Sequence, residues 1–111
     1  MKPGVQAEQL AAQYLQQQGL KLLDANYRCR FGEIDLVLRD GETLVFAEVR
    51  KRSNADFGGA AASIDRRKQQ RLILTAQHYI ASSPGDRPCR FDAVLLDAGD
   101  RIEWVKNAFE L

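Results

Sequence analysis

Apolar residues recur along this chain with two different periods, and the change of period marks the expected elements. Residues 5–18 carry them three and four positions apart, with glutamines at most other positions, which predicts an amphipathic helix ending near Gly19. The same spacing returns after residue 63 and predicts a second helix, capped by Ser63 or Asp65 and ending at about Ser82. The expected buried faces are Ala7, Leu10, Ala11, Tyr14 and Leu15 in the first helix and Ile64, Leu72, Ala76 and Tyr79 in the second.

Apolar and β-branched residues also concentrate in shorter segments, which predict strands. These segments are residues 20–30, 32–39, 43–52, 89–97 and 101–106. The turn residues Asp40-Gly41 join the second and third strands as a hairpin, and the small, glycine-rich stretch 53–63 is expected to be a loop. One helix, three strands, one helix and two strands in this order predict the α/β class. We expect a three-layer sandwich with a central mixed β-sheet and a helix on each face.

The composition is that of one globular domain spanning residues 1–111. Hydrophobic residues make up 45% and charged residues 28%, which argues against a disordered chain and allows one core. No apolar run approaches the roughly 20 residues that a membrane-spanning helix needs, and the first residues do not have the pattern of a secretory signal. The cysteines, Cys29 and Cys89, are too few for a disulfide framework and lack metal-site spacing. We therefore expect a cytoplasmic protein.

The charges are unevenly distributed, although the net charge is only +1. Residues 50–71 contain seven basic side chains and two acidic ones. The basic residues of this band are Arg50, Lys51, Arg52, Arg66, Arg67, Lys68 and Arg71. A cationic band beside acidic residues suits an enzyme that acts on phosphodiesters, whereas ordinary solvated surface charge is the alternative explanation.

The predicted hairpin carries acidic residues where core strands are usually apolar. Because side chains two apart share a face of a strand, Glu33 and Asp35 point the same way, and Glu48 shares a face with Arg50. Pairing across Asp40-Gly41 brings Asp35 near Glu48 and Arg50. Clustered carboxylates are unfavourable on an apolar sheet unless a cation compensates them, and their hard oxygen atoms suit Mg²⁺ or Mn²⁺. An interstrand ion pair between Asp35 and Arg50 is the structural alternative.

Three polar side chains of the two helices are considered as further site residues. Glu8 lies on the buried side of the first helix, where it can face the site or, alternatively, reach solvent or favour the helix N-terminus. Lys68 falls within the buried face of the second helix. His78, the sole histidine, has no triad-like partners and is expected on the surface.

Several short motifs occur in a recognisable order. They are Gly4 and Ala7-Glu8 before the Tyr14-Leu15 helix, Asn26-Tyr27-Arg28, Gly32-Glu33-Ile34-Asp35-Leu36, Val45-Phe46-Ala47-Glu48-Val49, Lys68, Arg90-Phe91-Asp92 and Asn107-Ala108-Phe109. With twelve residues between Asp35 and Glu48, the chain resembles the PD-(D/E)xK nuclease superfamily. More closely, it resembles the small bacterial YraN family, relatives of archaeal Holliday-junction resolvases.

That resemblance implies a restriction-endonuclease-like fold and roles for individual residues. Asp35 and Glu48 would be the metal ligands, with the Val49 carbonyl as a further one, and Glu8 matches the first-helix glutamate of the resolvases. Arg50 stands where the superfamily motif has lysine, and arginine can stabilise charge but cannot act as a base at ordinary pH. Lys68 is the candidate substitute for the missing lysine. The remaining basic residues expected to bind nucleic acid are Arg52, Arg66, Arg67 and Arg71.

The leading hypothesis is a Mg²⁺- or Mn²⁺-dependent endonuclease that hydrolyses DNA, with branched or irregular DNA as candidate substrates and repair or recombination as the setting. The alternative is a catalytically weakened or inactive nucleic-acid-binding module that keeps the nuclease fold, as Arg50 in the lysine position suggests. A third is a structural or partner-binding domain whose acids pair with its basic residues. Resolvases commonly act as two-fold dimers, so a homodimer is a candidate assembly. Its candidate contacts, which could equally be core, are Val94, Leu95, Leu96, Trp104 and Phe109.

Overall fold

The computed structural model describes residues 3–51, 64–82, 85, 87–97, 99 and 101–109, with side chains from Gln6 onward. Its elements are helix α1 (Pro3–Gln17), strands β1 (Lys21–Cys29), β2 (Gly32–Asp40) and β3 (Thr43–Lys51), helix α3 (Arg66–Ala81), and strands β4 (Cys89–Leu96) and β5 (Ile102–Phe109). The predicted loop 53–63 and Arg52 lie outside the described residues.

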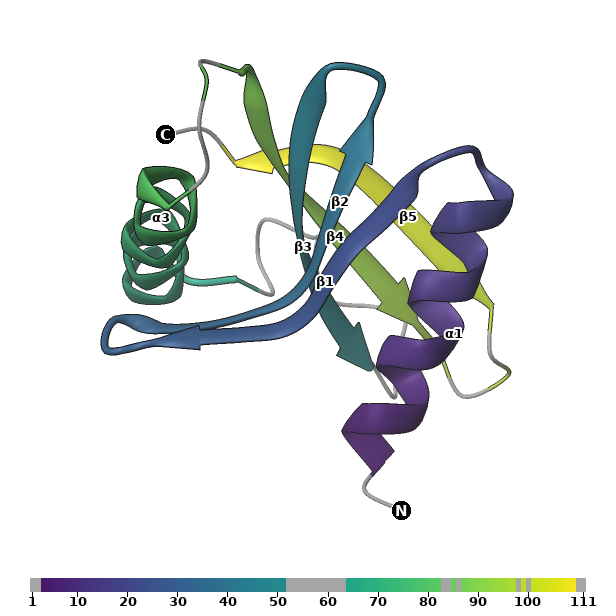
Figure 1. The fold of residues 1–111 in the computed structure, drawn as a ribbon. Coiled ribbons are helices and arrows are strands. Elements are labelled where there is room, and N and C mark those ends of the chain that lie inside the picture. Colours follow the sequence, from purple (N-terminus) through teal and green to yellow (C-terminus); the bar gives the residue numbers. More distant parts are fainter. Residues whose placement is uncertain are drawn as a thin grey trace.

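The five strands form one mixed sheet in the order β1-β2-β3-β4-β5. Strands β3 and β4 run parallel, and each of the other neighbouring pairs is antiparallel. The segment that contains α3 makes the crossover that a parallel pair requires. Figure 1 shows α1 and α3 on opposite sides of the sheet. The α/β class and the three-layer arrangement are therefore confirmed.

Two apolar clusters hold the layers together, one on each face of the sheet. On the α1 side, the fully buried Ala11 and Leu15 pack with Leu36 and Val45 of the sheet. On the α3 side, Leu72 and Ala76 pack with Phe46, Phe91 and other strand residues. Since successive strand residues point to opposite faces, the near-continuous apolar runs of β3 and β4 supply both clusters.

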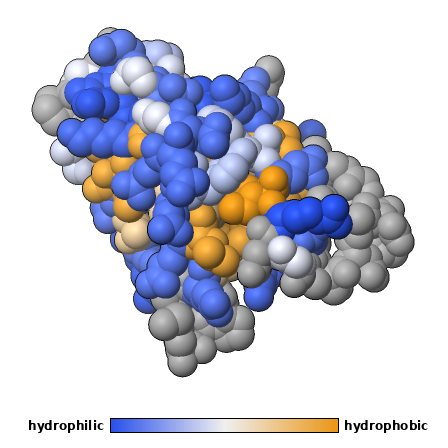
Figure 2. Space-filling view, turned by 90° about the vertical axis from the view of Figure 1, so that its right-hand side faces the viewer, coloured by the Kyte–Doolittle hydropathy of each residue, from blue (hydrophilic) through white to orange (hydrophobic). Residues whose placement is uncertain are grey.

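The outer side of the α1 layer is mostly polar. Figure 2 shows this side as largely hydrophilic, interrupted by an apolar patch. The partly buried apolar residues packed against the cluster on this side are Leu10, Tyr14, Leu22, Val49, Ile102 and Trp104.

The predicted element boundaries are close to those observed, with one clear difference. Asp65 caps α3 by accepting a hydrogen bond from the Lys68 backbone N–H at 2.8 Å, as one of the two predicted caps. Strand β5 continues to Phe109 rather than ending at residue 106, because the Phe109 ring stacks on Phe91 with centroids 4.7 Å apart. Phe109 and the Val94–Leu96 segment, which were candidate dimer contacts, are buried core residues. No described helix is long and apolar enough to span a membrane.

Candidate functional site

The candidate site lies where β2 separates from β3. Pairing between these strands is recorded as far as Leu36 opposite Ala47, whereas β2 stays paired with β1 to its first residue, Gly32. One position beyond the last pair, a side chain replaces the backbone as the link between the two strands. The Asp35 Oδ2 atom accepts a hydrogen bond from the Val49 N–H at 2.8 Å. Strand divergence thus leaves a carboxylate facing the end of β3, in the position that the hairpin pairing predicted.

Asp35 and Glu48 form a buried carboxyl pair at this point. Glu48 is only 4% exposed, and Asp35 is half-buried. Burial, a hydrogen bond with Asp35 and the negative charge of Asp35 raise the pKa of Glu48 from 4.5 to about 7. The pKa of Asp35 is also raised, chiefly by burial, and the nearby charge of Glu8 adds to the increase. Without a metal, the two carboxyls therefore tend to share a proton, held mainly by Glu48.

Glu8 approaches the same place from α1. One carboxylate oxygen each from Glu8, Glu33 and Asp35 lie within 4.8 Å of one another. Glu33 also accepts a hydrogen bond from Arg28 Nε at 2.8 Å. Glu33 was not among the predicted site residues, although its shared strand face with Asp35 was the signal that could have identified it.

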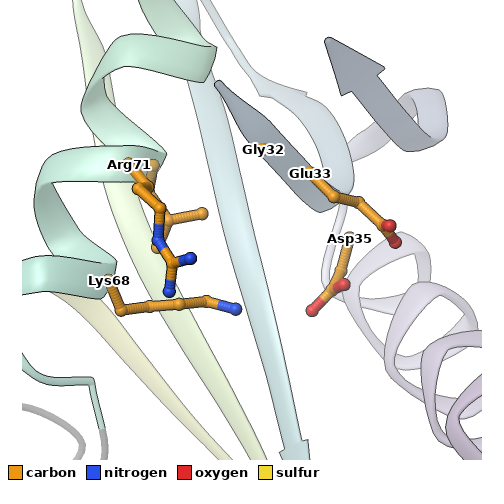
Figure 3. A pocket seen from close by; sticks show the side chains of 6 residues that line it. Gly32, Glu33, Asp35, Lys68 and Arg71 are labelled. Carbon is orange, nitrogen blue, oxygen red and sulfur yellow. The ribbon is translucent and has the colours of Figure 1, made fainter. Parts of the chain in front are cut away.

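Lys68 reaches the carboxyl pair from the first turn of α3. Its Nζ lies 3.1 Å from Glu48 Oε2, and this cation opposes the rise in the Glu48 pKa. A cavity of about 270 Å³ separates the helix from the start of β2. Its lining residues are Gly32, Glu33, Asp35, Lys68, Arg71 and Leu72. In Figure 3, the Lys68 side chain extends from α3 toward the Asp35 carboxylate, the Arg71 guanidinium lies close to the Lys68 side chain, and the Glu33 carboxylate points away from α3.

The other predicted residues lie around this centre. Arg50 is half-buried in β3, paired in register with Leu95, and by strand alternation lies on the same face as Glu48. Arg66, Arg67 and Arg71 are exposed on α3. The structure thus brings together Glu8, Asp35, Glu48 and Lys68, which the sequence analysis combined from four separate segments.

The donor set fits a hard divalent cation. The carboxylate oxygens of Asp35, Glu8 and Glu33 converge, and the Glu48 carboxyl, which is hydrogen-bonded to Asp35 but is not part of this group of three, is almost wholly removed from solvent. Such acidic groups repel one another unless they are protonated or bound to a cation. Oxygen ligands are those preferred by Mg²⁺ and Mn²⁺, and histidine and cysteine ligands, which other metals favour, are absent from the carboxylate group found among the described residues.

Comparison with known proteins identifies the family. The model of the uncharacterised protein family UPF0102 matches residues 7–96. A UPF0102 protein of Nitrosomonas europaea is 62% identical over 109 residues, covering 96% of this chain and 92% of the relative. A UPF0102 protein of Methylobacillus flagellatus is 58% identical, covering 96% and 95%, and one of Pseudomonas putida is 52% identical, covering 98% and 94%. The chain therefore belongs to UPF0102, the YraN family that its motifs indicated.

Proposed function

We propose that this protein is a metal-dependent endonuclease that hydrolyses phosphodiester bonds of DNA. The observation that carries this function is the meeting of Asp35, Glu48 and Glu8 at the point where β2 leaves β3, with the Lys68 ammonium group 3.1 Å from Glu48 Oε2. Placing carboxyl groups side by side where they are shielded from solvent is unfavourable for a fold, so a function is the better explanation for their presence.

Asp35 and Glu48 would hold Mg²⁺ or Mn²⁺, and the Val49 carbonyl is the candidate backbone ligand. Val49 is already fixed beside the pair, because its N–H donates to Asp35 at 2.8 Å. When bound, the cation supplies Lewis-acid polarisation of the phosphoryl oxygens and makes a water molecule more acidic. Glu8 and Glu33 extend the acidic surface beyond Asp35 and would orient water or further hydrated metal.

Two basic residues have separate roles in this site. Lys68 occupies the neighbourhood of Glu48, which is where an amine can hold an attacking water or neutralise developing charge. A guanidinium group is a poor general base, so the role of Arg50 would be electrostatic stabilisation of the phosphate rather than proton transfer. Lysine contributed from α3 would thereby replace the lysine that the superfamily motif has on β3.

The basic side chains on the outside of α3 would bind the DNA backbone. Arg66, Arg67 and Arg71 are exposed, and Arg71 also lines the cavity. Such contacts recognise phosphate and shape rather than base sequence. Branched or irregular DNA remains the proposed substrate class within this function, with repair or recombination in the cytoplasm as the setting and a homodimer as the candidate assembly.

Cleavage of defined DNA tests the function directly. Purified protein is incubated with duplex, single-stranded and four-way DNA, with Mg²⁺, Mn²⁺ or EDTA. We expect metal-dependent cleavage, lost by more than about a hundredfold in Asp35→Asn and in Glu48→Gln, because each removes a ligand charge. Glu42→Gln is the matched control, since this acid is exposed in the turn at the opposite end of the hairpin.

Metal binding gives a second readout that does not require turnover. Mn²⁺ at ten times its dissociation constant should raise the free energy of unfolding by about 1.4 kcal/mol, and Asp35→Asn should remove this increase. Metal-dependent stabilisation and DNA binding without cleavage of any substrate would favour the alternative of a weakened or inactive binding module. Absence of both metal and DNA binding would contradict both functions.

The role of Lys68 is tested separately. Lys68→Ala should lower the cleavage rate by about tenfold to a hundredfold while leaving the Mn²⁺-induced stabilisation in place, because the carboxylates remain. Unchanged cleavage in this variant would exclude Lys68 from the reaction. Gln70→Ala is the helix control, since Gln70 is exposed on the same turn of α3.

A further inference from the structure

The tip of the β1–β2 hairpin extends past the sheet toward α3, beside the cavity. Arg30 and Phe31 form its two-residue turn, between Cys29 and Gly32, which are paired in register. Gly32 and Glu33, which directly follow the turn, line the cavity. Figure 1 shows the hairpin diverging from β3 and running beneath α3.

Several contacts fix this tip against α3. The Tyr27 hydroxyl and His78 Nδ1 are hydrogen-bonded at 2.6 Å, and the Tyr27 ring packs edge-on against Tyr79 at 5.0 Å. His78 is exposed, as predicted, but it therefore has a structural partner. The Gly32 backbone also lies close to α3, because a Cβ added there would lie 3.3 Å from Thr75 Oγ1. The position of the tip relative to Arg71 and Lys68 is thus set by packing.

The charged groups at the tip are held outward. The Arg30 guanidinium lies 4.8 Å from the centroid of the Phe31 ring, and the Phe31 ring in turn packs edge-on against His78 at 6.3 Å. An arginine stacked on an aromatic ring loses less conformational freedom on binding than a free one. Arg28, whose side chain is 74% exposed, stands on the same hairpin and contacts Glu33.

We propose that the Arg28–Phe31 tip is a phosphate-binding arm, which contacts the DNA backbone on the side of the cavity away from Arg66 and Arg67. This role rests on the proposed function, and it adds a second basic surface to the arginines that were predicted from the sequence to bind nucleic acid. Arg71 lines the cavity between the tip and the first turn of α3. A nucleic-acid strand entering the cavity would then meet basic groups on both sides, with the acids of β2 and β3 between them.

Salt dependence of DNA binding tests this arm. Binding of Arg30→Ala to duplex and four-way DNA is measured in EDTA over a series of salt concentrations. Losing one phosphate contact should reduce the slope of log K against log salt by about 0.9, and Arg30→Lys should largely restore it. Arg28→Ala with Arg30→Ala should reduce the slope by about twice that amount. Arg30→Ala is the primary variant because Arg28 also contacts Glu33.

Lys21→Ala is the matched control, because it removes the same charge from the other, exposed end of β1. It should leave the slope unchanged. Equal slopes for Arg30→Ala and the wild type, or equal losses in Arg30→Ala and Lys21→Ala, would overturn the arm. Cleavage assays on the same proteins separate the two levels. If DNA binding depends on Arg30 but the wild type shows no metal-dependent cleavage, the nuclease function alone is contradicted. If the wild type cleaves DNA but its binding is unchanged by Arg30→Ala, the arm alone is contradicted.

Discussion

Two buried carboxylates on adjacent strands of this sheet have very different surroundings. Asp92 of β4 is fully buried and is one register position from Glu48 of β3, since β3 and β4 pair Ala47 with Asp92 and Glu48 with Ala93. Asp92 accepts hydrogen bonds from Arg90 Nε at 3.0 Å, from Trp104 Nε1 at 2.9 Å and from the Asn107 N–H at 3.0 Å. Glu48 instead faces another carboxyl group, and the ion pair recorded for it is the Lys68 contact at 3.1 Å.

The difference is between a carboxylate whose hydrogen bonds stabilise the fold and one that lies beside a second carboxyl group. The pairing register of β4 and β5 is irregular between Phe91 and Ala93 of β4, which is where Asp92 lies. On β5, Asn107 adopts a positive φ of 54° at this irregularity and donates its N–H to Asp92. Asp92 therefore fixes the position of β5. The Asp35–Glu48 pair is held by the Val49 N–H and the Lys68 ammonium group, and the burial of two mutually repelling carboxyls is unfavourable for stability in the metal-free protein. The donors around these acids thus distinguish Asp92, which has a structural role, from Asp35 and Glu48, for which we propose a chemical one.

Replacing the structural acid should have the largest effect on stability. Asp92→Asn removes one of the two carboxylate charges that pair with Arg90, leaving that of Asp40, and turns an amide N–H₂ toward at least one existing donor. We expect a loss of about 3–4 kcal/mol in the free energy of unfolding, measured by urea denaturation at neutral pH. Glu48→Gln provides the comparison and should not destabilise the metal-free protein, because the neutral amide imitates the protonated acid. A larger loss in Glu48→Gln than in Asp92→Asn would reverse the assignment of the two acids.

The pH dependence of stability should come from the site pair. The pKa of Glu48 rises from 4.5 to about 7 on folding, so the folded state binds this proton more tightly than the unfolded state. The resulting stabilisation is fully present below about pH 4.5 and is lost as the pH rises through about 7. Its size is on the order of 3 kcal/mol. Asp35, whose pKa is also raised, acts in the same direction.

Urea midpoints of the wild type and Glu48→Gln between pH 4.5 and 8, in EDTA, isolate this term. The wild type should lose stability relative to the variant as the pH rises, because the variant cannot titrate at this position. Saturating Mn²⁺ should oppose the loss, since a metal binds the deprotonated carboxylates. Parallel pH profiles for the two proteins in EDTA would show that folding does not change the pKa of Glu48. The contrast between the surroundings of Glu48 and those of Asp92 would then have no effect on stability.

The parts of this fold that the sequence predicted are those set by the spacing of apolar residues within a single segment. The boundaries of α3 and of the β2–β3 hairpin follow from patterns within each segment, and the Asp35–Glu48 proximity follows from hairpin pairing. The resemblance to the nuclease superfamily supplied the roles, which remain proposals. The donors of Asp92 could not be predicted in the same way, because they depend on a register irregularity between β4 and β5. Glu33 joins the carboxylates because β2 separates from β3, which is a tertiary feature.

The Lys68 contact should make the smallest contribution to stability. Its side chain is 35% exposed, so solvent screens the ion pair with Glu48, and Lys68→Met should change the free energy of unfolding by only about 0.5 kcal/mol at pH 7. The variant should nevertheless raise the pKa of Glu48 above about 7, because the Lys68 charge is a cause that lowers it. The loss of stability with pH should then shift to higher pH, whereas Lys68→Arg, which keeps the cation, should leave the profile in place. An unchanged profile in Lys68→Met would mean that the amine does not act on Glu48 in solution. Lys68 would then have no more electrostatic effect on Glu48 than the exposed arginines of α3 have.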